Sequence, residues 1–285
     1  MLKNVFLTVL LPLLIAIILR VFFLEIYRIP SSSMERTLLQ GDIILVSKMS
    51  YGARLLKPVT YFNKRKIEYT RIKGWNRIRK GDVFVFNWPR YNTFSDSLAN
   101  IYGGAVVKRC FGMPGDSVLI KYEELRINND WKKRDEMGEY DYGEVLFPHD
   151  TALDWSVDNY GPLYLPVRGG SILLSEKNLL WYRDVLLFEN YEDSMFDSLL
   201  TLQTDTLPEY TFRDNYYFMV GDNFYNSQDS RYWGFVPEGN IIGKAVLVLC
   251  SFDHQKSGFE RIRWNRLFHR IESHTTELNE ANDIK

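Results

Sequence analysis

The chain has 285 residues, of which 46% are hydrophobic and 15% aromatic, enough for one large or two modest folded domains. It carries 35 Lys and Arg residues against 36 Asp and Glu residues, a balance that argues against a nucleic-acid-binding protein. No Cys/His cluster has zinc-ligand spacing, so we expect neither a metal nor another cofactor. Cys110 and Cys250 fit either a disulfide in an oxidising compartment or two reduced thiols.

The first predicted element is an apolar helix over residues 5–24. About twenty apolar residues match the length that an α-helix needs to cross a hydrocarbon layer of about 30 Å. Pro12 can kink such a helix without preventing it from spanning, and Arg20 can extend its charge to the headgroups. A cleaved signal peptide is the alternative, but the segment ends in bulky residues instead of small ones. We therefore expect residues 1–25 to form a retained transmembrane anchor, whose orientation the flanking charges do not decide.

The chain beyond this segment contains short runs of β-branched and aromatic residues, many of them flanked by Gly-Asp turns. Five runs are predicted to form strands: residues 43–46, 83–86, 105–107, 118–120 and 245–249. Repeated short strands favour a sandwich or barrel over alternating βαβ units. The expected fold class is therefore mainly β: one N-terminal transmembrane helix, then an antiparallel β-rich domain.

Residues 121–205 differ in texture from both flanks, because they are acidic and aromatic without a clear period. We interpret this stretch as an insertion or second subdomain. It divides one β core into a first part, residues 26–120, and a second part, residues 206–273. Residues 274–285 are polar and lack an apolar face, so we expect a frayed tail.

Serine and lysine are the residues of interest for chemistry, because a serine hydroxyl needs a nearby base before it becomes a nucleophile. Ser33 lies shortly after the apolar segment. Only His254, of the four histidines, is placed where it could serve as that base, which leaves lysine as the main candidate. Lys108 ends the apolar run 103–107, and burial there would lower its pKa toward neutrality. From periodicity alone, an exposed lysine at a strand end is the favoured interpretation.

Four segments resemble the motifs of type I signal peptidases, in that family's order. They are Ile29-Pro30-Ser31-Ser32-Ser33-Met34 with Gly41-Asp42, Lys80-Gly81-Asp82-Val83, Val107-Lys108-Arg109-Cys110-Phe111-Gly112, and Gly221-Asp222-Asn223 with Asn226-Ser227-Gln228-Asp229-Ser230-Arg231. The resemblance covers the β core and leaves the insertion unaligned. It implies a membrane-bound serine endopeptidase, a hydrolase that removes N-terminal signal peptides from exported precursors.

The resemblance also implies roles for individual residues. Ser33 would be the nucleophile, Lys108 its general base, and Ser227 the residue that orients the lysine amine. The Ser33 backbone N–H and the Ser31 hydroxyl would form the oxyanion hole, in which one donor is typically worth ~10²–10³ in rate. The arrangement needs no metal and no cofactor.

Residues around this dyad would shape the site and receive the substrate. Asp229 and Arg231 would form a structural ion pair. Five residues would line shallow apolar pockets for the small side chains before the cleavage site: Ile29, Pro30, Met34, Leu38 and Val107. The extended substrate would add as a strand beside the core.

Three residues depart from the family pattern. Arg36 stands where the family usually has proline, and Phe224 and Tyr225 stand where it usually has polar or charged residues. None of them removes a catalytic group, so they bear on substrate preference or rate.

The resemblance also implies partners and a location. The partners would be signal peptides of secretory precursors, the lipid bilayer and the nearby secretion machinery, with no nucleic acid. The catalytic domain would lie on the exported (periplasmic or extracellular) side of the cell (inner) membrane.

Two other functions stay open at this point. A self-cleaving Ser/Lys repressor-type protease is disfavoured by the apolar segment and the missing DNA-binding region. A catalytically inactive membrane-anchored protein that binds precursors, or assists a partner peptidase, would differ from the enzyme only in lacking activity that depends on Ser33 and Lys108.

Overall fold

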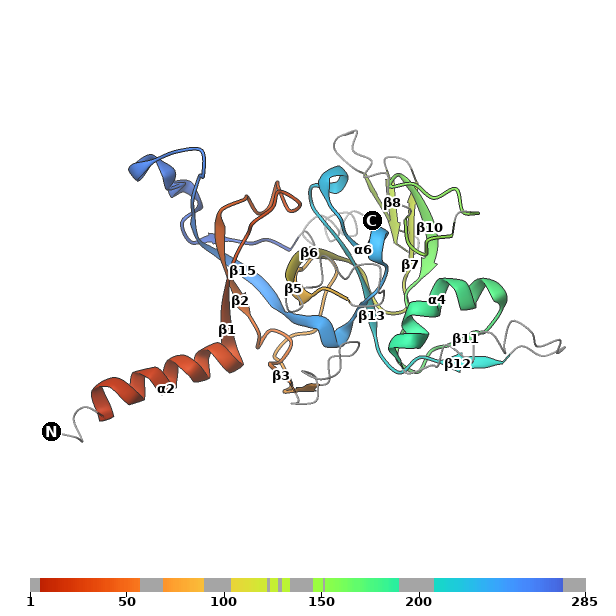
Figure 1. Ribbon diagram of the computed structural model, residues 1–285, viewed down its shortest axis with the longest axis horizontal. Coiled ribbons are helices and arrows are strands. Elements are labelled where there is room, and N and C mark those ends of the chain that lie inside the picture. The colour runs from red at the N-terminus through yellow and green to blue at the C-terminus, as the bar shows by residue number, and fades with distance from the viewer. Residues whose placement is uncertain are drawn as a thin grey trace, which may run out of the picture.

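A computed structural model of the chain describes residues 6–56, 69–89, 104–121, 124–127, 130–133, 146–150, 152–189 and 208–273. The expected frayed tail, residues 274–285, lies outside them. The body is built around one antiparallel sheet (Figure 1). The mainly β fold class is therefore confirmed.

Eight strands form this sheet: β1 (Leu24–Arg28), β2 (Asp42–Ser47), β5 (Val83–Asn87), β6 (Ala105–Gly112), β13 (Tyr216–Val220), β14 (Val236–Pro237), β15 (Ile241–Ser251) and β16 (His269–Arg270). Their order is β1-β2-β15-β5-β6-β13-β14, and β16 pairs with β15. The predicted runs at 43–46, 83–86, 105–107 and 245–249 all lie in these strands, and 118–120 lies in a second sheet. Strands far apart in sequence thus become neighbours, which brings the motifs together.

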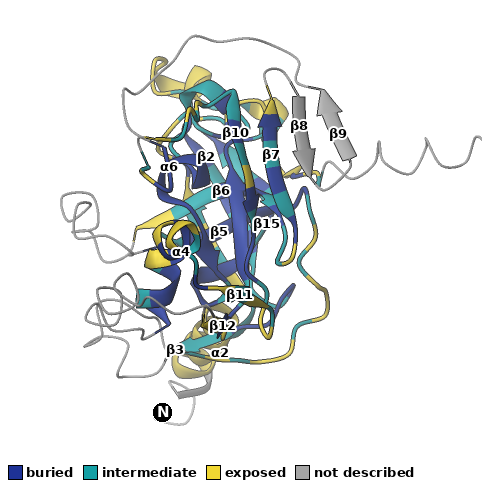
Figure 2. Ribbon diagram, turned by 90° about the vertical axis from the view of Figure 1, so that its right-hand side faces the viewer, coloured by how far each residue is buried: buried dark blue, intermediate teal, exposed yellow. Residues whose placement is uncertain are grey.

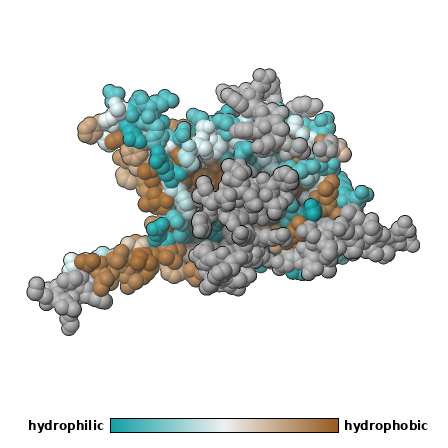
Figure 3. Space-filling view, viewed as in Figure 1, coloured by the Kyte–Doolittle hydropathy of each residue, from teal (hydrophilic) through white to brown (hydrophobic). Residues whose placement is uncertain are grey.

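A helical stretch precedes the sheet and consists of η1 (Phe6–Leu10), α2 (Leu11–Ile18) and η2 (Leu19–Phe23). It projects from the body as an apolar rod (Figures 1 and 3), and Leu13 is 54% exposed. Within the described ranges, no helix has both the length and the apolar content required to cross a bilayer. Lys48 attaches the end of the rod to the body, because its Nζ donates to the Arg20 carbonyl at 2.8 Å and pairs with Glu25 at 2.8 Å.

The predicted insertion contains part of a four-stranded sheet, ordered β10-β7-β8-β9, then β11 and α4. β11 pairs with β12, which follows the insertion in the chain. The bounds are β7 (Ser117–Lys121), β8 (Glu124–Ile127), β9 (Asp130–Lys133), β10 (Asn159–Tyr164), β11 (Ser171–Leu173), α4 (Glu176–Phe188) and β12 (Glu209–Thr211). A separate two-stranded antiparallel sheet pairs β3 (Arg54–Leu56) with β4 (Tyr69–Arg71). Ser175 caps α4 by accepting from the Asn178 N–H at 3.2 Å, a stabilising N-cap. The second sheet, α4, β11 and β12 lie at the end of the body opposite the apolar rod, whereas β3 lies near the middle of the body (Figure 1).

Three apolar clusters fill the interior, and among the strands of the main sheet β5 and β13 are the most completely buried. Figure 2 shows β5 among the buried strands at the centre of the body. The largest cluster joins Val118 and Tyr182 to Phe218 and Phe235, so the insertion packs on the strands of the main sheet. A second cluster lies beneath the segment between β1 and β2. Cys110 is buried in the third, and both it and Cys250 are free thiols.

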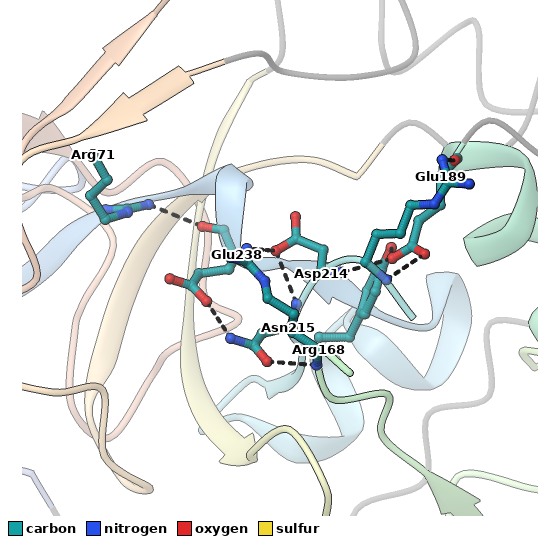
Figure 4. A network of polar contacts seen from close by, with 8 residues as sticks. Arg71, Arg168, Glu189, Asp214, Asn215 and Glu238 are labelled. Atoms are coloured by element: carbon teal, nitrogen blue, oxygen red, sulfur yellow. Dashed lines mark hydrogen bonds and ion pairs between the residues drawn. The ribbon is translucent and has the colours of Figure 1, made fainter. Parts of the chain in front are cut away.

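A polar junction fastens the insertion to β13 where the chain returns to the core (Figure 4). Glu189 follows α4, is fully buried, and accepts hydrogen bonds from the hydroxyls of Tyr210 and Tyr216 at 2.7 and 2.8 Å. It also accepts from the backbone N–H groups of Arg213 and Asp214 at 2.8 and 2.9 Å. Four donors satisfy this carboxylate, so it joins three segments without an unpaired buried charge.

Candidate active site

Ser33 lies in a tight turn between β1 and β2. The Glu35 N–H donates to the Ser32 carbonyl at 2.8 Å, and the Leu38 N–H donates to the Met34 carbonyl at 2.8 Å. The Ser31 and Ser33 hydroxyls lie 3.4 Å apart. The turn therefore presents two serine hydroxyls side by side.

Lys108 lies in the middle of β6, between β5 and β13, and is only 3% exposed. Its Nζ donates to the Ser227 hydroxyl at 3.0 Å. Burial lowers the pKa of the amine to about 8, with the Arg231 charge adding to the effect and the Asp229 and Asp222 charges opposing it. The expected burial of Lys108 is confirmed, and the exposed-lysine alternative is wrong.

Gly221 is where the serine turn and the lysine's partner meet. A Cβ at this position would lie 2.1 Å from the Ser227 Oγ and 2.5 Å from the Ser33 carbonyl oxygen. Only glycine permits so close an approach. The structure therefore brings Ser33, Ser227 and Lys108 to one place. Within the described part of the chain, no hydrogen bond joins the Ser33 hydroxyl to Lys108.

Asp229 and Arg231 form the expected ion pair, at 2.8 Å, with both side chains completely buried. Burial by itself would raise the pKa of the Asp229 carboxyl, but the charge and hydrogen bonds of Arg231 outweigh it and hold that pKa below its usual value. The Asp229 carboxylate also accepts from the Gly221 N–H, at 3.0 Å. The pair thereby holds the turn that carries Ser227.

A second ion pair was not anticipated from the sequence. Arg109 donates to both oxygens of Asp222 at 2.7 Å, and to the Thr37 hydroxyl at 2.9 Å. It therefore joins the serine turn, the lysine strand and the last motif. In the sequence, the one indication was that Arg109 follows Lys108 in the same motif. The motif did not indicate the partners of Arg109.

The expected substrate-binding residues are placed unequally. Ile29, Met34 and Leu38 are at most 2% exposed and belong to the second apolar cluster, with Val107 packed against it. Pro30 is exposed and, with Ile29, lines an open depression of about 500 Å³. The structure thus gathers four of the five beneath the serine turn and leaves Pro30 at its surface.

His254 lines the same depression and lies between two guanidinium groups. Its ring nitrogens lie 2.8 Å from Arg28 and 3.1 Å from Arg261. No contact of the described residues connects it to Ser33. The structure therefore supports setting histidine aside as the base.

The three departures from the family pattern each have a structural position. Arg36 has a φ of 98°, which L-residues rarely adopt. Phe224 lies against the Arg231 guanidinium, 3.7 Å from its ring centroid, and the Tyr225 hydroxyl donates to Asp158 of the insertion at 3.1 Å. The two aromatic residues thus brace the last motif instead of facing the serine turn.

The groups assembled here define a class of protein. A buried lysine of lowered pKa, a hydroxyl that orients it and a serine turn held against the same glycine are the parts of a serine hydrolase that uses lysine as its base. In the described ranges, no group of three or more His, Cys, Asp or Glu side chains could hold a metal ion.

Comparison with known proteins identifies the family. Residues 2–250 match the family model described as signal peptidase, peptidase S26. Signal peptidase I of Buchnera aphidicola subsp. Acyrthosiphon pisum is 32% identical over 274 residues, covering 90% of this chain and 78% of the relative. Signal peptidase I of Pseudomonas aeruginosa is 32% identical over 255 residues, covering 86% and 71%. That of Haemophilus influenzae is 30% identical over 283 residues, covering 92% and 74%.

The chain belongs to the signal peptidase family, peptidase S26. It is a serine endopeptidase, and the resemblance of its motifs to type I signal peptidases is confirmed. The alternative of an inactive precursor-binding protein receives no support from these relatives.

Proposed function

We propose that this signal peptidase removes N-terminal signal peptides from exported precursors with Ser33 as nucleophile and Lys108 as general base. One observation carries the proposal: Lys108 is buried, oriented by the Ser227 hydroxyl at 3.0 Å, and has a pKa lowered to about 8. A substantial fraction of such an amine is neutral near pH 7 to 8, so it can accept a proton.

The reaction follows from these groups. The Ser33 Oγ forms a bond to the scissile carbonyl carbon while its proton passes to Lys108 Nζ and the carbonyl π electrons move to oxygen. The Ser33 N–H and the Ser31 hydroxyl donate to that oxyanion. When the C–N bond breaks, Lys108 returns the proton to the leaving amine. Water then attacks the acyl-enzyme, gives its proton to Lys108, and Ser33 leaves with a proton from the lysine.

Supporting residues keep this arrangement in place. Ser227 orients the amine, and the ion pair of Asp229 and Arg231 fixes the turn that carries Ser227. Residues 121–205 act as an inserted subdomain that braces this turn from outside, through contacts such as Tyr225 with Asp158.

The substrate would bind along the serine turn as an added strand. Pro30 and Val107 would contact it directly, above a floor of Ile29, Met34 and Leu38. A shallow surface over a filled core admits small side chains before the cleavage site and rejects bulky ones by steric exclusion.

The apolar segment, residues 1–25, would anchor the enzyme to the lipid bilayer, with the catalytic domain on the exported side near the secretion machinery. Exposed apolar side chains along α2 support this placement (Figure 3). Phe259 and Trp264 add to it, because they are 84% and 62% exposed, and aromatic rings suit a membrane interface.

Cleavage of a precursor with an Ala-x-Ala site by the detergent-solubilised full-length protein tests the activity. We expect a cut after the second Ala, read by mass spectrometry, that Ser33→Ala and Lys108→Ala both abolish. Lys80→Ala is the matched control, because Lys80 is a half-exposed lysine paired with Asp116 and should leave cleavage intact. Cleavage that survives Lys108→Ala would remove lysine from the base role.

A separate experiment tests the placement. Membrane fractions should retain the full chain after alkaline extraction, and a variant without residues 1–24 should be released. Protease added from the exported side should digest the catalytic domain. Digestion from the opposite side only would overturn the proposed orientation.

A further inference from the structure

The peptide unit that joins Ser32 to Ser33 carries the backbone donor of the proposed oxyanion hole. This peptide is planar and trans, so the Ser32 carbonyl points away from the Ser33 N–H and the two groups turn together. Any group that fixes the Ser32 carbonyl therefore fixes the direction of the N–H. Within the described part of the chain, no hydrogen bond occupies the Ser33 N–H.

Asn223 contacts this unit from the last motif. Its side-chain Nδ2 donates to the Ser32 carbonyl at 3.1 Å, alongside the Glu35 N–H at 2.8 Å. Its backbone N–H donates to the Ser33 carbonyl at 3.1 Å. Asn223 thus holds the backbone on both sides of Ser33. Two donors on one carbonyl also polarise the peptide and strengthen its N–H as a donor.

Asn223 is itself held rigidly. The preceding residue, Asp222, accepts from two guanidinium nitrogens of Arg109, Nε and Nη2, and the Asn226 N–H donates to the Asn223 carbonyl at 3.0 Å. A donor in a fixed frame positions its partner more sharply than a mobile one, because a small misplacement of a reacting geometry costs rate.

We propose that Asn223 is a positioning residue that aims the Ser33 N–H at the oxyanion through the Ser32 carbonyl. The inference rests on the proposed function of Ser33. Asn223 touches no reacting atom. Its carboxamide orients the Ser33 N–H, which donates to the scissile carbonyl oxygen when that oxygen takes up the π electrons displaced by the new Ser33 Oγ bond.

Asn226 provides a matched comparison. Its Nδ2 lies 3.0 Å from the Ser32 hydroxyl, so it contacts the same residue without touching the peptide unit. In Asn226→Asp, the Ser32 hydroxyl can rotate and donate to the new carboxylate. In Asn223→Asp, the Ser32 carbonyl cannot donate, so two acceptors face each other. Both variants add one negative charge to the same motif.

The test measures kcat, KM and the pH profile for Asn223→Asp, Asn223→Ala and Asn226→Asp in the full-length enzyme. We expect both Asn223 variants to lose about tenfold to a hundredfold in kcat, a large part of one oxyanion donor, with KM changed less than threefold. In Asn223→Ala, which adds no charge, the limb of the pH profile set by Lys108 should keep its midpoint. Asn226→Asp should lose less than about threefold. Asn223→Ala adds no charge and carries the test if Asn223→Asp does not fold.

Three outcomes would overturn the inference. Equal losses in Asn223→Asp and Asn226→Asp would mean that the motif acts through general rigidity. A loss expressed in KM, or a pH midpoint shifted in the uncharged variant Asn223→Ala, would place the effect on substrate binding or on Lys108. If the wild-type enzyme shows no cleavage that depends on Ser33, the proposed function fails and this inference with it; unchanged kcat in an active enzyme refutes this inference alone.

Discussion

Lys108 and Glu189 are both buried ionisable side chains, yet the two regions that hold them treat charge in opposite ways. Glu189, at the junction of the insertion, is 0% exposed and accepts from four donors. Lys108, in the catalytic region, is 3% exposed and, in the described part of the chain, donates one hydrogen bond, to an uncharged hydroxyl.

The difference explains what each region does. A carboxyl group surrounded by donors has both of its oxygens hydrogen-bonded in the interior and holds segments together. An amine with one neutral partner is costly to keep charged, so burial lowers its pKa to about 8 and makes it available as a base. At the junction, the buried Glu189 stabilises the fold. In the catalytic region, the buried Lys108 costs stability and provides a base.

The largest expected effect concerns Glu189, whose carboxyl oxygens accept from four donors. Glu189→Gln should destabilise the protein by about 3–5 kcal/mol, because the new NH₂ group faces donors that it cannot accept from. Denaturant unfolding of the detergent-solubilised protein measures this. Glu209→Gln, at an exposed position on β12, is the control and should stay within about 0.5 kcal/mol of wild type. If both variants lost the same free energy of unfolding, the four donors around Glu189 would not stabilise the protein as proposed.

Removing the charge of Lys108, which has one neutral partner, should instead stabilise the folded protein. Lys108→Met keeps the apolar stem and removes the amine, so at pH 7 it should stabilise the protein by about 3 kcal/mol while abolishing cleavage. The sign follows from linkage: the folded pKa of about 8 lies below the ordinary 10.5, so the wild type bears the full cost below pH 8. The advantage of the variant should shrink between pH 8 and 10.5. A destabilised variant at pH 7 would indicate that Lys108 is better satisfied than its contacts show.

The same pKa predicts the activity profile. Because neutral Lys108 is the active form, kcat/KM should rise about tenfold per pH unit below pH 8 and level off above it. Initial rates of precursor cleavage between pH 5.5 and 9.5 measure this, with unfolding monitored at each pH as the control. A midpoint near the ordinary pKa of histidine would show that another base titrates.

The smallest effect sharpens the comparison at the serine turn, where strain is stored in the backbone. Arg36 has a φ of 98°, so Arg36→Gly should stabilise the protein by about 1 kcal/mol. Arg36→Ala, which keeps the strained backbone, should change little. Arg36→Pro should destabilise it, because proline requires a φ near −65°. Thermal unfolding distinguishes these variants, and equal midpoints for Gly and Ala would rule out strain.

Local pattern was sufficient for the strands, whereas periodicity alone favoured an exposed Lys108. The runs at 43–46, 83–86 and 245–249 form strands because β-branched and aromatic side chains suit a pleated, half-buried surface. Lys108 is buried because the apolar residues before it belong to a strand inside the sheet. The roles of Ser33, Ser31 and Ser227 came from resemblance and stay predictions, and Ser33→Ala tests the first of them.

Only the tertiary structure decided which groups became partners. Arg109 contacts Asp222 and Thr37, each more than seventy residues away in the sequence. Asn223 contacts Ser32, nearly two hundred residues away. Glu189 gains its four donors because α4 ends beside β13. Sequence periodicity reports which face of an element is apolar, but long-range hydrogen bonds depend on how the sheet orders its strands, and no local pattern encodes that order.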